Sequence, residues 1–293
     1  MNAGAAASIQ ARLLALAKSR GEDFNLTLNR YGLERFLYRL SISPAREHYW
    51  LKGALLFDLW FDVPHRPTRD ADFLGFGPAD ADAVRKALAE VCRIEAPDEM
   101  TFDPDSIAIE EIREDARYGG LRVRIKGLLG KTRCALQLDI GYGDAVTPGP
   151  QEIEFPTLLA DQPAPRLHAY PRATVVSEKL EAIASIGMTN SRMKDYFDLR
   201  ALAREGAIDR DELASAVAAT FARRKTPLPE GLPLGLSEEF AQDAGRKALW
   251  KAFLGKNRLD APPLEEVVAE VRRFVEPPLK AAFKVQQGNV AKT

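Results

Sequence analysis

The 293-residue sequence predicts an α/β (α+β) fold, in which a mixed sheet is flanked by helices and followed by a helical C-terminal region. Three patterns lead to this prediction. Apolar residues recur at helical spacing over the first 40 positions, β-like segments occupy much of residues 70–140, and helical spacing returns beyond Pro171. We expect two domains, with the sheet in residues 1–170 and a helical domain in residues 171–293.

The first elements are expected to be helices. Residues 8–19 and 24–40 carry apolar side chains at helical spacing, and Ser43-Pro44 ends the second segment because proline disfavours a helical residue before it. Residues 50–60 are almost wholly apolar, which favours a buried helix behind a turn at Gly53. The next two expected elements are a strand at residues 70–73 and a helix at residues 78–94.

The middle of the chain is rich in β-like patterns. Residues 121–126 alternate apolar and basic side chains, which is typical of a half-exposed strand. After a loop at residues 127–130, residues 133–140 are expected to return as the antiparallel partner, and residues 152–156 to add a short edge strand. The chain beyond these strands is expected to be helical, apart from a Pro/Gly-rich interruption at residues 226–235.

Composition is that of an ordinary globular protein and excludes several classes. The hydrophobic fraction is 46%, the charged fraction 28% and the net charge −1, so no global charge indicates nucleic-acid binding. A local basic face of Arg122, Arg124 and Lys126 could contact RNA, or could simply be solvated. No apolar run is long enough to span a membrane, and the N-terminus lacks a signal-peptide pattern. Cys92 and Cys134 lie in apolar contexts, as expected of reduced thiols in a cytoplasmic protein.

The clearest chemical signal is a pair of carboxylates, Asp70 and Asp72, in the expected strand. Residues i and i+2 of a strand face the same side, so both carboxylates project together while Ala71 and Phe73 face the core. Adjacent carboxylates repel unless a cation lies between them, and Mg²⁺ or Mn²⁺ accepts such oxygen ligands together with substrate phosphates. The upstream Gly53 supplies a turn where phosphate oxygens can approach backbone N–H groups.

A third carboxylate strengthens this interpretation. Asp139 lies near the end of an otherwise apolar strand, where a lone acid is costly to bury unless it is paired or metal-bound. Three strand-borne acids, Asp70, Asp72 and Asp139, are typical of a two-metal site for phosphoryl or nucleotidyl transfer. For the Asp70–Asp72 pair alone, ordinary surface or turn carboxylates are the competing explanation.

A second group of charged residues follows in the helical region. Residues 174–186 are expected to form a helix that carries Lys179, and Asn190 or Ser191 could cap the next helix. The first turns of that helix hold charged side chains beside an apolar stripe: Arg192, Lys194, Asp195 and Asp198. The ordinary alternative is that Lys179 is a surface charge and that Arg192 pairs with Asp195.

Four ordered motifs resemble those of the AbiEii/AbiGii toxin family. They are Leu51-Lys52-Gly53-Ala54, Arg66-Pro67-Thr68-Arg69-Asp70-Ala71-Asp72, Glu178-Lys179-Leu180 and Asn190-Ser191-Arg192-Met193-Lys194-Asp195. This family, which includes the MenT toxins, is nucleotidyltransferase-like and related to the DNA polymerase β-type superfamily. The resemblance extends from about residue 9 to about residue 205.

The resemblance implies a nucleotidyltransferase-like sheet and a toxin from a toxin–antitoxin or abortive-infection system. Such an enzyme uses a nucleoside triphosphate (NTP) and Mg²⁺ to modify the 3′ end of tRNA, and a neighbouring gene supplies its antitoxin. Asp70 and Asp72 match the metal-binding pair, Asp139 fits the third acid, and Lys179 and Asp195 match residues essential for activity. The implied nucleotide-binding residues are Lys52, Gly53, Ala54, Arg66, Thr68 and Arg192.

One departure and two alternatives accompany this resemblance. Many superfamily members have Gly-Ser where this chain has Gly53-Ala54, so backbone N–H groups with Lys52 or Arg66 would have to hold the triphosphate. The expected reaction is attack of a hydroxyl on the α-phosphorus with loss of pyrophosphate. The acceptor could instead be a protein or small molecule, or the chain could bind nucleotide without catalysis.

Overall fold

The computed structural model describes residues 3–61, 65–113 and 119–290 of the chain. Contacts between residues divide the chain into two compact units. The first unit runs to Gly143 and includes Gln151–Ala169, whereas the second contains Asp144–Pro150 and the chain from Tyr170 onward. The chain therefore enters the second unit briefly before it returns to complete the first.

A mixed sheet forms the centre of the first unit. In the described part of the chain it has seven strands in the order β3-β4-β5-β2-β1-β7-β6. Strand β2 runs parallel to β5 and antiparallel to β1, which makes the sheet mixed as predicted. The strands are β1 (Tyr49–Lys52), β2 (Asp70–Gly75), β3 (Met100–Arg113), β4 (Gly119–Leu129), β5 (Thr132–Tyr142), β6 (Gln151–Glu154) and β7 (Arg166–Ala169).

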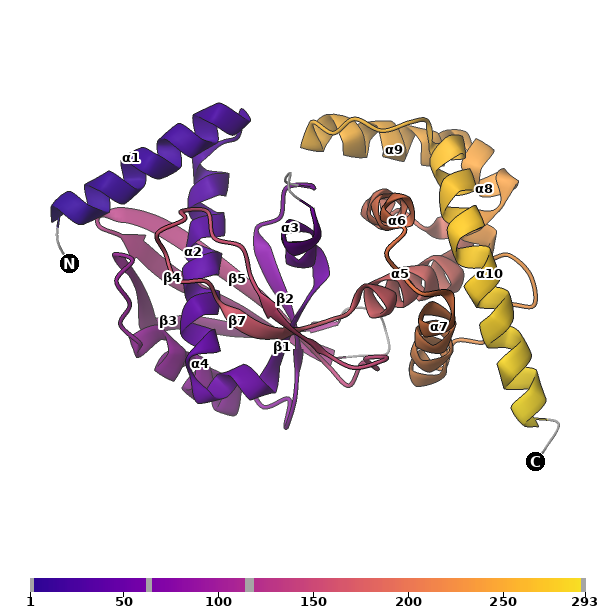
Figure 1. The fold of residues 1–293 in the computed structure, drawn as a ribbon, viewed down its shortest axis with the longest axis horizontal. Coiled ribbons are helices and arrows are strands. Elements are labelled where there is room, and N and C mark those ends of the chain that lie inside the picture. The colour runs from indigo at the N-terminus through magenta and orange to yellow at the C-terminus, as the bar shows by residue number, and fades with distance from the viewer. Residues whose placement is uncertain (1–2, 62–64, 114–118, 291–293) are drawn as a thin grey trace. The chain divides into compact units, whose positions relative to one another are not determined.

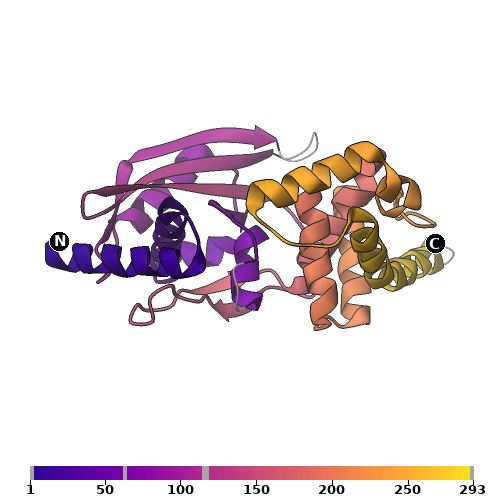
Figure 2. The ribbon, with the colours of Figure 1, turned by 90° about the horizontal axis from the view of Figure 1, so that it is seen from above.

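Helices cover this sheet. Helix α2 packs against β5 and β7, and α4 packs against β3 and α2 (Figure 1). Helix α1 contacts α2, and α1 is the indigo helix beside the N-terminus in Figure 2. The helices of the first unit are α1 (Ala3–Arg20), α2 (Phe24–Ser41), α3 (Leu56–Trp60) and α4 (Ala81–Arg93), with short 3₁₀ segments at Pro44–His48 and Gly53–Leu55.

The two faces of β5 have different chemistry. Cys134 and Leu136 lie so close to Gly32 of α2 that a Cβ there would come within 2.6 Å of the Cys134 sulfur and 3.1 Å of Leu136. Because side chains alternate along a strand, the odd-numbered positions, including Gln137 and Asp139, project from the opposite face. The polar face of the sheet is therefore the one that α2 does not cover.

A fully buried ion pair ties α2 to the chain before β3. Arg39 donates to both carboxylate oxygens of Asp98, at 2.6 and 2.9 Å, and to the carbonyl oxygens of Ile94 and Met100. Buried charges are costly unless their hydrogen bonds are satisfied, and both side chains of this pair are well satisfied. The pair thus fixes α2 beneath the sheet.

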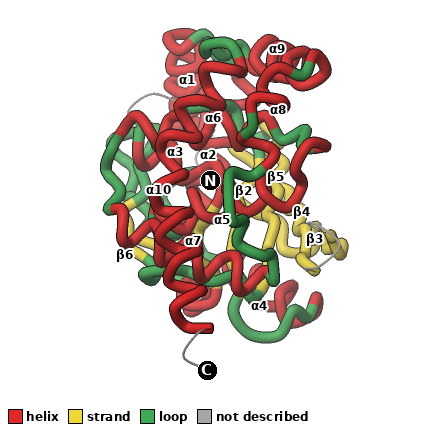
Figure 3. Tube along the Cα trace, turned by 90° about the vertical axis from the view of Figure 1, so that its right-hand side faces the viewer, coloured by secondary structure: helices red, strands yellow, loops and turns green. Residues whose placement is uncertain are grey.

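The second unit is helical, as Figure 3 shows by the red of α5, α6, α7 and α10. Helix α5 packs mainly on α7, and α10 packs on both α6 and α7. The buried hydroxyls of Ser177 and Thr220 join α5 to α7 at 2.7 Å. The helices are α5 (Arg172–Ile186), α6 (Met193–Glu205), α7 (Arg210–Arg224), α8 (Glu238–Gln242), α9 (Ala244–Asn257) and α10 (Leu264–Val290), with 3₁₀ segments at Gly187–Thr189 and Leu234–Leu236.

The expected helix at residues 50–60 is wrong for its first half. Tyr49–Lys52 is strand β1, which pairs with β2 and β7, and only Leu56–Trp60 is α-helical. A central strand covered on both faces is apolar at nearly every position, so its sequence resembles that of a buried helix. The strands at 100–113 and 166–169 were not predicted.

From the sequence, we expect no apolar run long enough to span a membrane. Among the described helices, none combines the length and apolar character that a membrane crossing requires.

Candidate active site

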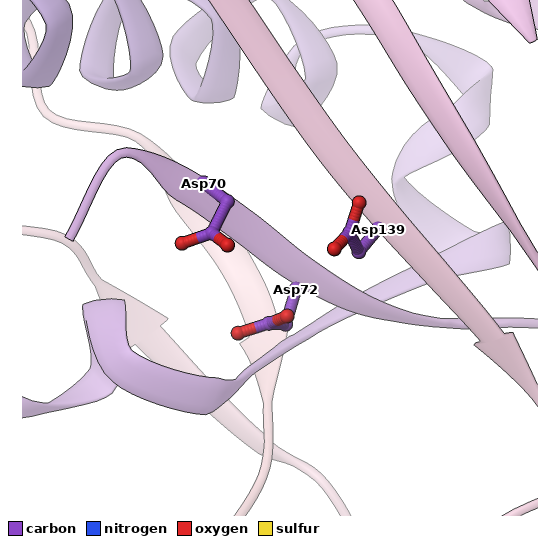
Figure 4. Close-up of side chains that lie close together, drawn as sticks. All are labelled: Asp70, Asp72 and Asp139. Carbon is purple, nitrogen blue, oxygen red and sulfur yellow. The ribbon is translucent and has the colours of Figure 1, made fainter. Parts of the chain in front are cut away.

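Three carboxylates converge on the polar face of the sheet. Asp70 and Asp72 extend from β2 and Asp139 from β5, and one oxygen of each lies within 4.8 Å of the others (Figure 4). The parallel register places Asp72 directly opposite Asp139, while Ala71 and Phe73 are buried in the core as predicted. Asp139 is buried and the other two acids are half-buried.

Neighbouring residues fix the positions of the first two acids. The Thr68 hydroxyl donates a hydrogen bond of 2.7 Å to Oδ1 of Asp70. Gly53 follows β1 with a φ of +74°, and a Cβ there would lie only 1.9 Å from Oδ2 of Asp72. Only glycine fits this close approach and this left-handed conformation, so the Gly53 turn and the Asp72 carboxylate form one local structure.

Charged residues form a row across four neighbouring strands. Arg122 of β4 pairs with Asp139 of β5, Asp139 with Asp72 of β2, and Asp72 with Lys52 of β1. Paired residues in adjacent strands project from the same face. Along this row the charges therefore follow the order cation, anion, anion, cation. Lys52 is buried, and its Nζ would be 3.4 Å from a Cβ at Gly141, so glycine there leaves room for the lysine.

Arg122 holds Asp139 through both carboxylate oxygens. Its Nε donates to Oδ1 at 2.8 Å and its Nη2 to Oδ2 at 2.7 Å, and the Gln137 amide adds contacts of 3.3 and 3.4 Å. Two residues further along β4, Arg124 forms the same kind of fork with Glu110 of β3. Two of the three basic side chains considered for RNA contact are therefore engaged by carboxylates.

A second charged cluster lies in the second unit, where α5 faces α6. The Lys179 ammonium is 2.8 Å from Oδ1 of Asp195 and 2.8 Å from Oδ2 of Asp198, and Arg192 Nε is 2.7 Å from Oδ2 of Asp195. Both aspartates are fully buried. Burial alone would raise the pKa of Asp195, but Lys179 and Arg192 together lower it below its ordinary value.

The start of α6 differs from the prediction. The helix begins at Met193 with Arg192 as its N-terminal cap residue, so neither Asn190 nor Ser191 caps it. Instead, the Asn190 side-chain oxygen accepts a 2.8 Å hydrogen bond from the Arg192 backbone N–H. Asparagine readily forms such a turn with the backbone two residues ahead, and here the turn aims Arg192 at Asp195.

The structure brings the predicted residues together in two groups. The first unit holds the three acids with Lys52, Gly53 and Thr68, whereas the second unit holds Lys179 with Asp195 and Arg192. Ala54 lies in the 3₁₀ segment after Gly53, and Arg66 is half-buried ahead of β2.

Two members of these groups were missed as site residues, Arg122 and Asp198. A tight turn directly after Leu129 would have pointed to Arg122. Strand β4 extends to Leu129, and the register with β5 that follows from this turn sets Arg122 opposite Asp139.

The acidic group suits a hard divalent cation. Mg²⁺ and Mn²⁺ prefer carboxylate oxygens, and Asp70, Asp72 and Asp139 offer three of them at close range. The buried Lys52 and the fork of Arg122 add two positive charges, which leaves one net negative charge among the five side chains. This remaining charge favours binding of a cation at the acidic group.

Comparisons with known proteins identify a family and a similar fold. A family model described as "Nucleotidyl transferase AbiEii toxin, Type IV TA system" matches residues 35–283. Among solved structures, JHP933 from Helicobacter pylori is similar with a TM-score of 0.50 and 18% identity, over 91% of this chain and 97% of that one. A second H. pylori protein, provisionally named a nucleotidyltransferase, has a TM-score of 0.46 and 20% identity over 88% and 96% of the two chains. None of the curated proteins matches.

Proposed function

The chain belongs to the AbiEii nucleotidyltransferase toxin family, and we propose that it transfers a nucleoside monophosphate from an NTP to the 3′ end of tRNA. Its membership makes it a nucleotidyltransferase of a type IV toxin–antitoxin system. The observation that carries the proposal is the convergence of Asp70, Asp72 and Asp139 within 4.8 Å on two adjacent strands. We further propose a cognate antitoxin and a cytoplasmic site of action, where NTPs and tRNA are found.

Mg²⁺, or Mn²⁺, is the proposed cofactor. Asp70 and Asp72 would hold it, with Asp139 as the third acid of the site. Bound there, the ion would neutralise charge on the triphosphate and favour departure of pyrophosphate. Thr68 keeps Asp70 in place, and Gly53 lets the turn approach the Asp72 carboxylate closely.

In the proposed reaction, the acceptor hydroxyl oxygen bonds to the α-phosphorus while the bond from that phosphorus to the β-phosphate oxygen breaks. Pyrophosphate leaves, and the hydroxyl proton passes to a carboxylate of the site or to water. We assign the triphosphate to the backbone N–H groups of Gly53 and Ala54 together with Lys52 and Arg66, with Thr68 and Arg192 as further nucleotide-binding residues. These N–H groups would replace the serine hydroxyl that many superfamily members have in place of Ala54.

Lys179 and Asp195 are proposed to be required for the same reaction. A lysine held by two buried carboxylates has a fixed position, which suits a preorganised donor to an anionic substrate group. We also propose that residues 1–170 act as the nucleotidyltransferase-like domain and residues 171–293 as the helical domain that contributes Lys179 and Asp195. The two units seen in the structure support this division.

The experiment that tests the function supplies each α-³²P-labelled NTP in turn, with Mg²⁺ and total cellular RNA and protein. We expect label in the tRNA band, and its loss when the tRNA 3′ end is first blocked by periodate oxidation. Label in protein would instead identify a protein acceptor, and binding of NTP without any transfer would identify a non-catalytic module.

The chain supplies its own matched control for the acids. Asp80-Ala81-Asp82 repeats the sequence of Asp70-Ala71-Asp72 but lies at the start of α4. Asp70→Asn/Asp72→Asn should abolish transfer, whereas Asp80→Asn/Asp82→Asn should retain it, because asparagine can still cap α4 at residue 80. Equal activity of both double variants would show that the acidic group takes no part in the reaction.

A further inference from the structure

Arg122 binds Asp139, the one acid of the site that lies on β5. Its two hydrogen bonds of 2.8 and 2.7 Å take both oxygens of Asp139, in the paired geometry that guanidinium and carboxylate groups favour. Asp70 is held differently, because the neutral hydroxyl of Thr68 donates to one of its oxygens. The three acids therefore differ in how accessible their oxygens are to a cation.

A cation and Arg122 would oppose each other at Asp139. The guanidinium is always charged, so it repels a nearby divalent ion as well as engaging both oxygens that would bind that ion. Asp139 itself is fixed by β5 and nearly buried, with 7% of its side chain exposed, whereas Arg122 is 31% exposed. If a cation is to reach Asp139, it is therefore the Arg122 side chain that moves.

We propose that Arg122 and a divalent cation compete for Asp139. The first cation is held by Asp70 and Asp72, and Asp139 becomes a metal ligand only when an anionic group draws Arg122 away. A triphosphate is suited to this exchange, since guanidinium forks onto phosphate as readily as onto carboxylate. The role of the triphosphate rests on the proposed function, whereas the competition for Asp139 can be measured without it.

The strand that carries Arg122 offers a close control. Arg124 lies two residues further along β4, on the same face, and forks onto Glu110 instead of onto an acid of the group. Loss of either arginine removes one positive charge and one two-bond fork onto a carboxylate from the same strand, and loss of Arg122 also removes its 4.0 Å ion pair with Glu110. Only loss of Arg122 releases Asp139.

The test is a titration of the full chain with Mn²⁺ alone, in the absence of nucleotide. The electron paramagnetic resonance signal of free Mn²⁺ measures how much of the ion is bound at each point. We expect one tightly bound ion per chain in the wild type and in Arg124→Gln. Arg122→Gln should bind a second ion, or bind the first at least tenfold more tightly. Thermal unfolding in EDTA, compared among the three proteins, verifies that each is folded.

A second pair of variants tests the competition without touching Arg122. Because Asp139 does not hold the first ion, Asp139→Asn should bind it within about threefold of the wild-type affinity. Asp72→Asn should weaken it by tenfold or more. Equal weakening by the two variants, or an unchanged titration for Arg122→Gln, would overturn the competition.

The same titration separates this proposal from the proposed function. If the wild type binds Mn²⁺ no better than Asp70→Asn/Asp72→Asn does, the acidic group is not a metal site and both proposals fail. If the wild type binds Mn²⁺ but Arg122→Gln behaves as Arg124→Gln does, only the competition fails.

Discussion

Gly53 is the residue whose size most directly controls the acidic group. In Gly53→Ala, the new Cβ would be placed 1.9 Å from Oδ2 of Asp72, so the carboxylate has to move. We expect nucleotide transfer to fall by roughly 100-fold, the scale of an ångström-sized displacement of a reacting group. Labelled transfer to tRNA measures the effect.

The control for this prediction is Gly21, which has a similar φ of +65° but where an added Cβ would meet no atom within 4 Å. Gly21→Ala should bear a similar backbone cost of about 1–2 kcal/mol while keeping transfer within about twofold. Comparable losses of activity in both variants would show that backbone strain alone is responsible.

Glu34 gives the first unit a pH dependence of its own. Burial raises the pKa of Glu34 from 4.5 to about 7, although Arg35 and the Leu158 backbone N–H oppose the rise. Between these two values the folded state holds a proton that the unfolded state has lost. The free energy of unfolding therefore falls as pH rises from about 4.5 to about 7.

Glu34→Gln removes this dependence because glutamine does not titrate. Urea unfolding at pH 5 and at pH 8 should show wild-type stability declining relative to Glu34→Gln by about 2.5 kcal/mol, since one pKa unit is worth about 1.36 kcal/mol and about two such units lie between pH 5 and the raised pKa of about 7. Other titrating groups cancel in this difference. Parallel pH profiles would contradict the assignment.

Single-residue prediction succeeded where the geometry was local. The side-by-side projection of Asp70 and Asp72 follows from strand alternation alone, and the structure has it. The fork between Arg122 and Asp139 depends on the register of β4 and β5. The sequence prediction paired the two strands but assigned a loop to residues 127–130, so their register, and with it the pairing of Arg122 with Asp139, could not be inferred.

Lys179 stabilises the packing of α5 against α6, in addition to its proposed role in the reaction. In Lys179→Met, the buried Asp195 and Asp198 would lose the ammonium that lies 2.8 Å from each. We expect the free energy of unfolding to fall by about 3–5 kcal/mol, the cost of leaving buried charge uncompensated. The idea of Lys179 as a surface charge, whose loss would be nearly neutral, does not fit this geometry.

Chemical denaturation measures this loss, with Lys194→Met as the control, because Lys194 lies exposed on α6. Lys179→Met/Asp198→Asn should recover part of the stability, since one of the two carboxylates that lose the ammonium is then neutral and the other, Asp195, keeps Arg192 at 2.7 Å. If that double variant regains stability but still fails to transfer nucleotide, the roles of Lys179 in folding and in catalysis are separate. A Lys179→Met protein as stable as the wild type would contradict the structural role.

At the level of elements, long periodic helices and the strands β2, β4, β5 and β6 were predicted, whereas β1, β3 and β7 were not. Strand β3 contains Pro104 and a register shift between Asp103 and Ala108, so its alternation is broken. Helix α10 continues through Pro277 and Pro278, which a sequence rule treats as a break. Packing against α6 and α7 outweighs that local preference.

For the whole molecule, the segment Asp144–Pro150 is the feature with most consequence. It belongs to the second unit although strands on both sides of it belong to the first. The Thr174 hydroxyl bonds both the N–H and the carbonyl of Thr147, at 3.1 and 3.0 Å, and Arg224 lies 3.3 Å from Asp144. These contacts hold the segment against α5 and α7.

Thr174→Val should release this segment, since valine keeps the shape of threonine but loses both hydrogen bonds. Two such bonds contribute about 2 kcal/mol, so local opening and proteinase K cleavage within residues 144–150 should rise more than tenfold. Mass spectrometry of the fragments locates the cuts. Ser177→Ala, which removes another buried hydroxyl from α5, should leave this cleavage rate unchanged; an equal rise would contradict the role of Thr174.

The order in which the chain is made gives this arrangement a meaning for the cell. Asp144 leaves the ribosome long before its partner Arg224 has been translated, and the acidic group is complete before Lys179 is translated. On the proposed role of Lys179, a prematurely terminated chain could hold a cation but could not modify tRNA. Ribosomes that abandon the message before Lys179 would thus release an inert fragment, and on the proposed roles transfer would require a chain that extends at least through Asp195.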